Sequence, residues 1–175
     1  MEPDKIVYIL RSLPGSGGST TARILAHGLP SAILSLDDYR KDHSGNYHYD
    51  QKQAKSILNV LDQKYDHHLQ NGTPLIIIDN VHYSKSDVDH FRIPAEKAGY
   101  TVIILEIPHE DPDILAQRTI HRVSKERIEK MMLRWDYIGY SMQWRRLLRF
   151  VRKRFKYLFH IIFPCWINSP FPKKE

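Results

Sequence analysis

Short apolar runs alternate with longer amphipathic stretches over residues 1–136 of the chain. The apolar runs have the length and character of buried strands and lie at residues 6–11, 32–36, 75–78 and 101–106. Stretches with helical spacing follow or separate them, at residues 19–27, 50–71, 85–98, 111–122 and 124–134. Ser124 is the expected N-cap of the last helix. Strands that alternate with helices predict an α/β domain with a mainly parallel sheet.

The carboxyl ends of parallel strands are where such a domain binds its ligands. Three of the predicted strands are followed by segments rich in glycine or polar residues, at residues 12–20, 37–40 and 79–80. We therefore expect a functional site where these three segments meet.

The segment after the first strand is close to the pattern of a phosphate-binding loop. That pattern is glycine, four residues, glycine, lysine, and then serine or threonine. Here Gly17 fills the second glycine slot and Ser19 the hydroxyl slot, whereas Ser12 stands in the first glycine slot and Gly18 in the lysine slot. The strand before the loop and the helix after it are the context that the motif requires.

A phosphate loop holds its anion mainly with backbone N–H groups and with the positive end of the following helix. Neither of these needs a side chain at position 18. The missing ammonium group is the one that reaches the β- and γ-phosphates during transfer. A glycine- and serine-rich turn without a ligand is the alternative explanation of this segment.

Aspartates follow two further strands. Asp37 and Asp38 come after residues 32–36, and Asp79 comes directly after residues 75–78. Nucleoside triphosphatases hold Mg²⁺ with an aspartate at a strand end, beside the loop hydroxyl. A carboxylate near the loop can also take a proton from an acceptor hydroxyl. Each aspartate could instead start a helix or a surface turn, but their occurrence at strand ends favours a common site.

Four segments together carry a resemblance to a known family. They read LPGSGGST at 13–20, SLDDYR at 35–40, GTPLIIIDN at 72–80 and AQRTIHRVSKERIEKMMLRWD at 116–136. With these segments, residues 6–137 resemble the P-loop kinase domain of the Nedd-four-binding-protein-two-like family. They are more distantly similar to the kinase domain of phage polynucleotide kinase. The resemblance implies the three-layer α/β sandwich of a P-loop NTPase.

The resemblance also implies a set of roles, with ATP and Mg²⁺ as cofactors and a nucleic-acid 5′ end as acceptor. Asp37 would be the general base for a 5′-hydroxyl, Arg40 would contact the acceptor phosphate, and Arg118 would offset charge on the γ-phosphate. Ser19 and Asp79 would hold the metal. The nucleotide would be bound by Gly15, Ser16, Gly17, Gly18, Ser19, Thr20 and Arg122.

Gly18 is the main departure from this family. Removal of one preorganised donor that stabilises transition-state charge lowers a rate by about 10²–10³. We therefore predict that ATP or another nucleotide binds weakly and that phosphoryl transfer to a hydroxyl is impaired or absent. The alternative is a catalytically dead pseudokinase that acts as a protein- or membrane-interaction module.

The composition is that of a globular protein, with 42% hydrophobic and 26% charged residues among 175. One cysteine, Cys165, excludes an intramolecular disulfide. The first residues are polar and show no secretory signal, and no apolar run reaches the roughly 18–20 residues that a membrane-spanning helix needs. We expect an intracellular protein, cytoplasmic or nuclear.

The net charge of +6 comes from the end of the chain. Residues 140–163 hold seven Lys and Arg and no acid, and without those seven the chain has 19 basic and 20 acidic residues. Apolar residues recur there at steps of three and four, which predicts a basic amphipathic helix in a separate segment, residues 137–175. Residues 140–167 would pack on the kinase-like domain, lie on an anionic membrane surface, or bind a protein partner or nucleic acid.

Overall fold

Four apolar segments pair as the strands of one parallel sheet. The structure, a computed structural model, describes residues 5–40, 51–136 and 138. In this part of the chain the sheet order is β2-β3-β1-β4, with β1 (Ile6–Arg11), β2 (Ser31–Leu34), β3 (Leu75–Asn80) and β4 (Thr101–Glu106). β1 pairs with β3 on one side and with β4 on the other, and it is buried from Val7 onward. The predicted parallel sheet is confirmed.

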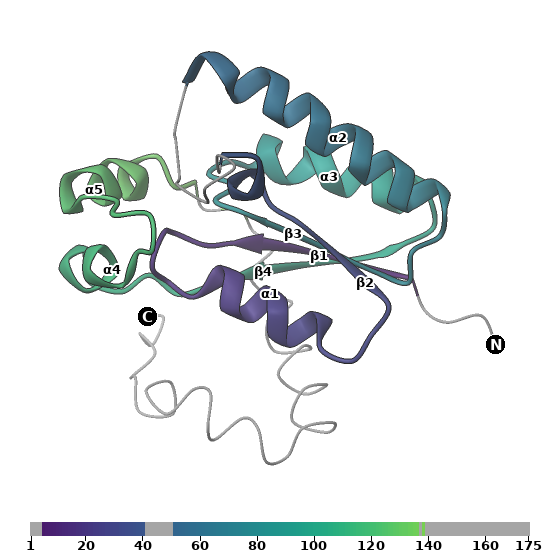
Figure 1. Cartoon of the computed structure of the whole chain (residues 1–175), viewed down its shortest axis with the longest axis horizontal. Coiled ribbons are helices and arrows are strands. Elements are labelled where there is room, and N and C mark those ends of the chain that lie inside the picture. The colour runs from purple at the N-terminus through teal and green to yellow at the C-terminus, as the bar shows by residue number, and fades with distance from the viewer. Residues whose placement is uncertain (1–4, 41–50, 137, 139–175) are drawn as a thin grey trace, which may run out of the picture. The chain divides into compact units, whose positions relative to one another are not determined.

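Helices cover both faces of the sheet and one of its ends. In the described ranges they are α1 (Gly18–Ala26), α2 (Ala54–Gln70), α3 (Lys85–Lys97), α4 (Pro112–Arg118) and α5 (Lys125–Leu133), with short 3-10 helices η1 (Leu36–Arg40) and η2 (Gln51–Gln53). α1 lies against one face, and α2 and α3 lie against the other (Figure 1). α4 and α5 form a hairpin beyond the carboxyl ends of the strands (Figure 1). This is the three-layer α/β sandwich that the sequence predicts.

The helix ends follow from local chemistry, and one of them differs from the prediction. Ser124 is the N-cap of α5, as expected, and its hydroxyl accepts a hydrogen bond from the Arg127 N–H at 3.4 Å. α4 stops earlier than predicted, at Arg118, because Thr119 is extended. Arg122 has a φ of 50°, which no α-helix contains. The predicted helix over 111–122 is therefore wrong over residues 119–122.

The segment after β2 also differs from the prediction. β2 ends at Leu34, and Leu36 already begins η1. The reason is a long-range contact, because the side-chain oxygen of Asn80 accepts the Leu36 N–H at 2.9 Å. α2 begins at Ala54, after η2, and not at residue 50.

Two apolar clusters hold the layers together. The larger lies between the sheet and the helices α2 and α3, and its members include Val7, Ile9, Leu61, Tyr65, Ile76, Ile78, Val88 and Phe91. The smaller joins Leu13 of the loop after β1 to Leu115 of α4 and Ile128 of α5. Burial of each such side chain contributes about 1.5–3 kcal/mol to the stability of the fold. The smaller cluster therefore fixes the helical hairpin against the loop.

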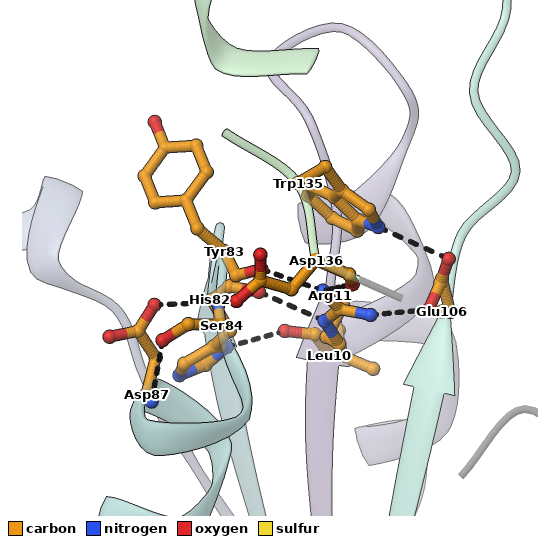
Figure 2. Close-up of polar contacts among 9 residues, drawn as sticks. All are labelled: Leu10, Arg11, His82, Tyr83, Ser84, Asp87, Glu106, Trp135 and Asp136. Atoms are coloured by element: carbon orange, nitrogen blue, oxygen red, sulfur yellow. Dashed lines mark hydrogen bonds and ion pairs between the residues drawn. The ribbon is translucent and has the colours of Figure 1, made fainter. Parts of the chain in front are cut away.

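A buried guanidinium group joins the carboxyl ends of three strands. Arg11, the last residue of β1, has no exposed surface. Its Nε donates to the carbonyl of His82 at 2.9 Å, and one terminal nitrogen donates to the carbonyls of Tyr83 and Asp136, each at 2.9 Å (Figure 2). The other terminal nitrogen donates to the carboxylate of Glu106, at the end of β4, at 2.5 Å.

Trp135 completes what we call the Arg11 cluster, which comprises Arg11, His82, Tyr83, Glu106, Trp135 and Asp136. The Trp135 indole N–H donates to the second carboxylate oxygen of Glu106 at 3.2 Å, and its ring centroid lies 4.3 Å from the Arg11 guanidinium carbon. The Asp136 N–H donates to the Tyr83 carbonyl at 2.9 Å. The chain that leaves α5 is thereby tied to the loop after β3.

His82 is a second buried polar residue at this edge. Its φ of 48° is left-handed, and its Nδ1 donates to the carbonyl of Leu10 at 2.7 Å (Figure 2). α3 begins just beyond it with a capping box, in which Ser84 and Asp87 each accept the other's backbone N–H (Figure 2). Burial lowers the pKa of His82 from its ordinary value of 6.5 to about 4.

No helix of the described ranges is long and apolar enough to cross a bilayer. The predicted boundary after residue 136 and the predicted C-terminal amphipathic helix lie outside the described residues.

We predict that Arg11→Met lowers the free energy of unfolding by about 3–5 kcal/mol, because it removes the cation that pairs with the Glu106 carboxylate and one donor from each of three carbonyls. Urea unfolding measures the change. Lys97→Met, on the exposed end of α3, is the matched control and should change the free energy by less than about 0.5 kcal/mol. Equal stabilities of the two variants would contradict this role of Arg11.

We predict that His82 makes the fold less stable in mild acid. Below pH 6.5 the unfolded chain takes up a proton on this histidine, whereas the folded chain does so only near pH 4. Protonation of His82 therefore has little effect on the free energy of unfolding above pH 6.5, and it lowers that free energy by about 2 kcal/mol between pH 7.5 and pH 5. His82→Asn keeps a side-chain donor and tolerates the positive φ. In urea unfolding at the two pH values, this variant should lose about 2 kcal/mol less than the wild type, and an unchanged pH dependence would refute the assignment.

Candidate functional site

The site residues that the sequence predicts all lie on one cleft. The cleft has a volume of about 1350 Å³ and lies at the carboxyl edge of the sheet, under the α4–α5 hairpin. It is lined by loop, strand-end and hairpin residues that include Gly15, Ser16, Gly17, Gly18, Ser19, Thr20, Asp37, Arg40, Asp79, Arg118 and Arg122. Residues far apart in the sequence are thus brought to the same cavity.

The loop after β1 has the backbone of an anion cradle. Gly17, at the N-cap of α1, has a φ of 97°, and no side chain caps the helix. The Ser16 N–H and hydroxyl both donate to the Leu13 carbonyl, at 3.1 and 2.8 Å, which closes the turn. The first N–H groups of α1 therefore carry no side-chain cap on the cleft side, as an anion-binding helix end requires.

Gly15 fixes the position of this loop for two independent reasons. Its φ is 81°, which favours glycine. A Cβ at this position would also lie well inside contact distance of the Leu115 carbonyl oxygen and 3.0 Å from the carbonyl carbon. The loop therefore packs directly on the backbone of α4, and only glycine allows that approach.

Ser19 and Asp79 are a hydroxyl and a carboxylate residue that both line the cleft. Asp79 is only 8% exposed, and burial raises the pKa of its carboxyl group above the ordinary value, with Asp37 and Asp38 acting in the same direction. A hydrogen bond from Ser19 and the charge of Arg23 oppose that rise. Hydroxyl and carboxylate oxygens are the donors that Mg²⁺ prefers, so this pair fits the predicted metal.

The two aspartates of η1 face different cavities. Asp37 lines the main cleft, whereas Asp38 lines a smaller one. One Asp37 oxygen accepts from Arg40 at 3.0 Å, and the other lies 3.7 Å from Nε2 of His121. Asp37 is therefore the η1 carboxylate that lines the main cleft. His121 is a neighbour that the sequence pattern does not indicate.

The α4–α5 hairpin supplies most of the positive charge of the cleft. Arg118, at the end of α4, pairs with Glu110 at 2.6 Å, and both side chains are about half exposed. Among the residues that the structure describes, the cations that line the cleft are Arg23, Arg40, Arg118, Arg122, Arg127, Lys130 and Arg134, and the carboxylates are those of Asp37, Asp79 and Asp87. The lining thus has a positive charge although the loop has no lysine.

Asn80 is a cleft residue whose role the sequence does not predict. Its side-chain oxygen holds the Leu36 N–H, and its side-chain nitrogen is buried without a hydrogen-bond partner among the described residues. The feature of the sequence that points to Asn80 as a cleft residue is its position directly after Asp79.

Comparison with known proteins assigns the family. An AAA domain family matches residues 7–139 of the chain. The chain belongs to this AAA domain family. The AAA domain is 34% identical to human NEDD4-binding protein 2 over 132 residues, which cover 73% of this chain and 7% of that protein. Human YLP motif-containing protein 1 is 28% identical over 158 residues, 77% of this chain and 7% of that protein.

The fold of the AAA domain has solved relatives as well. A chain in the structure of the Pnkp1/Rnl/Hen1 RNA repair complex superposes with a TM-score of 0.61 at 20% identity, over 77% of this chain and 45% of that chain. The resemblance to the P-loop kinase domain of the Nedd-four-binding-protein-two-like family is thereby confirmed. The chain spans about 7% of the length of the two human relatives.

Proposed function

We propose that this AAA domain binds ATP or another nucleotide as a P-loop domain of the polynucleotide or nucleoside kinase type. The observation that carries the proposal is the convergence of an open helix N-terminus, the Ser19–Asp79 pair and the hairpin arginines on one cleft. Phosphate groups would bind at the N–H groups from Gly15 to Thr20, with Arg122 beside them.

Ser19 and Asp79 would hold Mg²⁺. When bound, this ion offsets the charge of the β- and γ-phosphates. Because the chain supplies Gly18 in place of the usual lysine, nucleotide binding would be weak. Arg118 would be left to offset the charge that develops during transfer, and phosphoryl transfer would be impaired or absent.

The acceptor side of the cleft would be formed by η1. Asp37 would take the proton of an acceptor hydroxyl, and Arg40 would contact an acceptor phosphate, with both residues lining the same cavity as the loop. A nucleic-acid 5′ end is the acceptor that the sequence resemblance implies.

Gly18 favours a second candidate, a pseudokinase that binds nucleotide or serves as an interaction module without catalysis. Residues 140–167 would then contact a protein partner or an anionic membrane surface. This segment lies outside the described residues, so its role stays a prediction from its charge and apolar pattern. We also propose an intracellular location, cytoplasmic or nuclear, with peripheral membrane attachment.

Titration calorimetry of Mg·ATP into the full chain tests the proposed site. We expect a dissociation constant between about 10 µM and 1 mM, which corresponds to roughly 4–7 kcal/mol. Asp79→Asn should weaken the binding of Mg·ATP at least about tenfold, because it removes one negative charge from the metal site. Asp66→Asn, on the exposed face of α2, is the control and should leave the affinity unchanged.

Undetectable heat at millimolar Mg·ATP with folded protein would refute the proposal, as would equal affinities of Asp79→Asn and wild type. Phosphoryl transfer to a 5′-hydroxyl oligonucleotide then separates the two candidates. Slow transfer that Asp37→Asn abolishes supports the kinase, and binding without any transfer supports the pseudokinase.

A further inference from the structure

Two unusual residues of the phosphate loop lie against each other. Ser12 and Gly18 occupy the slots in which the motif has glycine and lysine, respectively. Both are buried, and Ser12 is 8% exposed. Ser12 directly follows β1, whereas Gly18 is the first residue of α1, so the loop folds back to bring them together.

There is no room for a side chain at position 18. A Cβ on Gly18 would lie 2.8 Å from the Ser12 Cβ, still closer to the Ser12 hydroxyl, and 3.1 Å from one carboxylate oxygen of Asp79. Rotation of the Ser12 side chain moves the hydroxyl away. It does not move the Ser12 Cβ, whose place is set by the backbone, so in this loop conformation the Ser12 Cβ conflicts with a side chain at position 18.

The conflict is one of space and not of backbone conformation. Gly17 has a left-handed φ, but Gly18 does not and is an ordinary helical residue. Gly18 is therefore a position where alanine would normally be favoured over glycine.

We propose that Ser12 and Gly18 are a coupled pair that replaces the glycine and lysine of the phosphate-loop motif. The Ser12 side chain takes the space through which a residue-18 side chain would leave the helix. Ser12 is thus the positioning residue that excludes a lysine from this loop. The absence of the lysine is built into the packing of the loop and is not reversible by one substitution.

The pair has a consequence for ligand binding that rests on the proposed function. With position 18 closed to cations, a bound polyphosphate meets backbone N–H groups from the loop. Its cationic contacts come from the hairpin, where Arg118, Arg122 and Arg127 line the cleft.

A thermal-unfolding cycle on the full chain without nucleotide tests the coupling directly. Gly18→Ala should lower the melting temperature by at least about 3 °C with Ser12 present, because the added carbon overpacks the contact. In the Ser12→Gly background the same substitution should raise it by about 1–3 °C, as expected for glycine to alanine in a helix. This reversal of sign is the expected signature of the pair.

Ser12→Ala is the matched control, because it removes the hydroxyl and keeps the Cβ. Gly18→Ala should still be destabilising in the Ser12→Ala background. The coupling is refuted if Gly18→Ala changes the melting temperature equally in the wild-type and Ser12→Gly backgrounds. The loss of destabilisation with Ser12→Ala would refute the assignment to the Cβ.

A second cycle measures the effect on nucleotide binding. Gly18→Lys alone should be destabilised and should gain no affinity for Mg·ATP, whereas Ser12→Gly with Gly18→Lys should bind at least about tenfold more tightly than Ser12→Gly. Equal gains in affinity with and without Ser12→Gly would overturn the proposal. If no variant binds Mg·ATP, the proposed function fails, and the unfolding cycle still decides on the pair.

Discussion

Arg11 joins three chain segments at the carboxyl edge of the sheet, where the cleft lies. One guanidinium group at the end of the central strand holds the loop after β3, the end of β4 and the chain that leaves α5. Removing such a charge from water costs several kcal/mol, which Glu106, three carbonyls and the Trp135 ring offset. Since the same contacts anchor the hairpin, the positions of the cleft arginines depend on this interaction.

Close packing also holds the loop after β1 against the α4–α5 hairpin. Gly15 allows the loop to touch the backbone of α4, and Leu13, Leu115 and Ile128 bury the seam between them. The charge that a phosphate-loop lysine would supply is therefore brought to the cleft by another element. If the loop binds an anion as proposed, the groups that hold the anion and the cations that offset its charge lie on different elements.

The layers and most of the cleft were predictable because local rules govern them. Apolar runs become buried strands, and cleft residues such as Asp79 lie at strand ends in a parallel sheet. The remaining features depend on contacts between distant residues. The Asn80 side chain accepts the Leu36 N–H just after the end of β2. Arg11 is the centre of a buried polar cluster. Ser12 occupies the space beside position 18. No periodicity or spacing in the sequence records such contacts.

Hydrogen–deuterium exchange on the full chain, with and without Mg·ATP, tests most directly whether this cleft is the nucleotide site. Nucleotide should slow exchange in residues 12–20 and in the hairpin residues 118–127, and should leave the outer turns of α2 unchanged. Protection confined to segments outside the cleft, or none at millimolar Mg·ATP, would contradict the account.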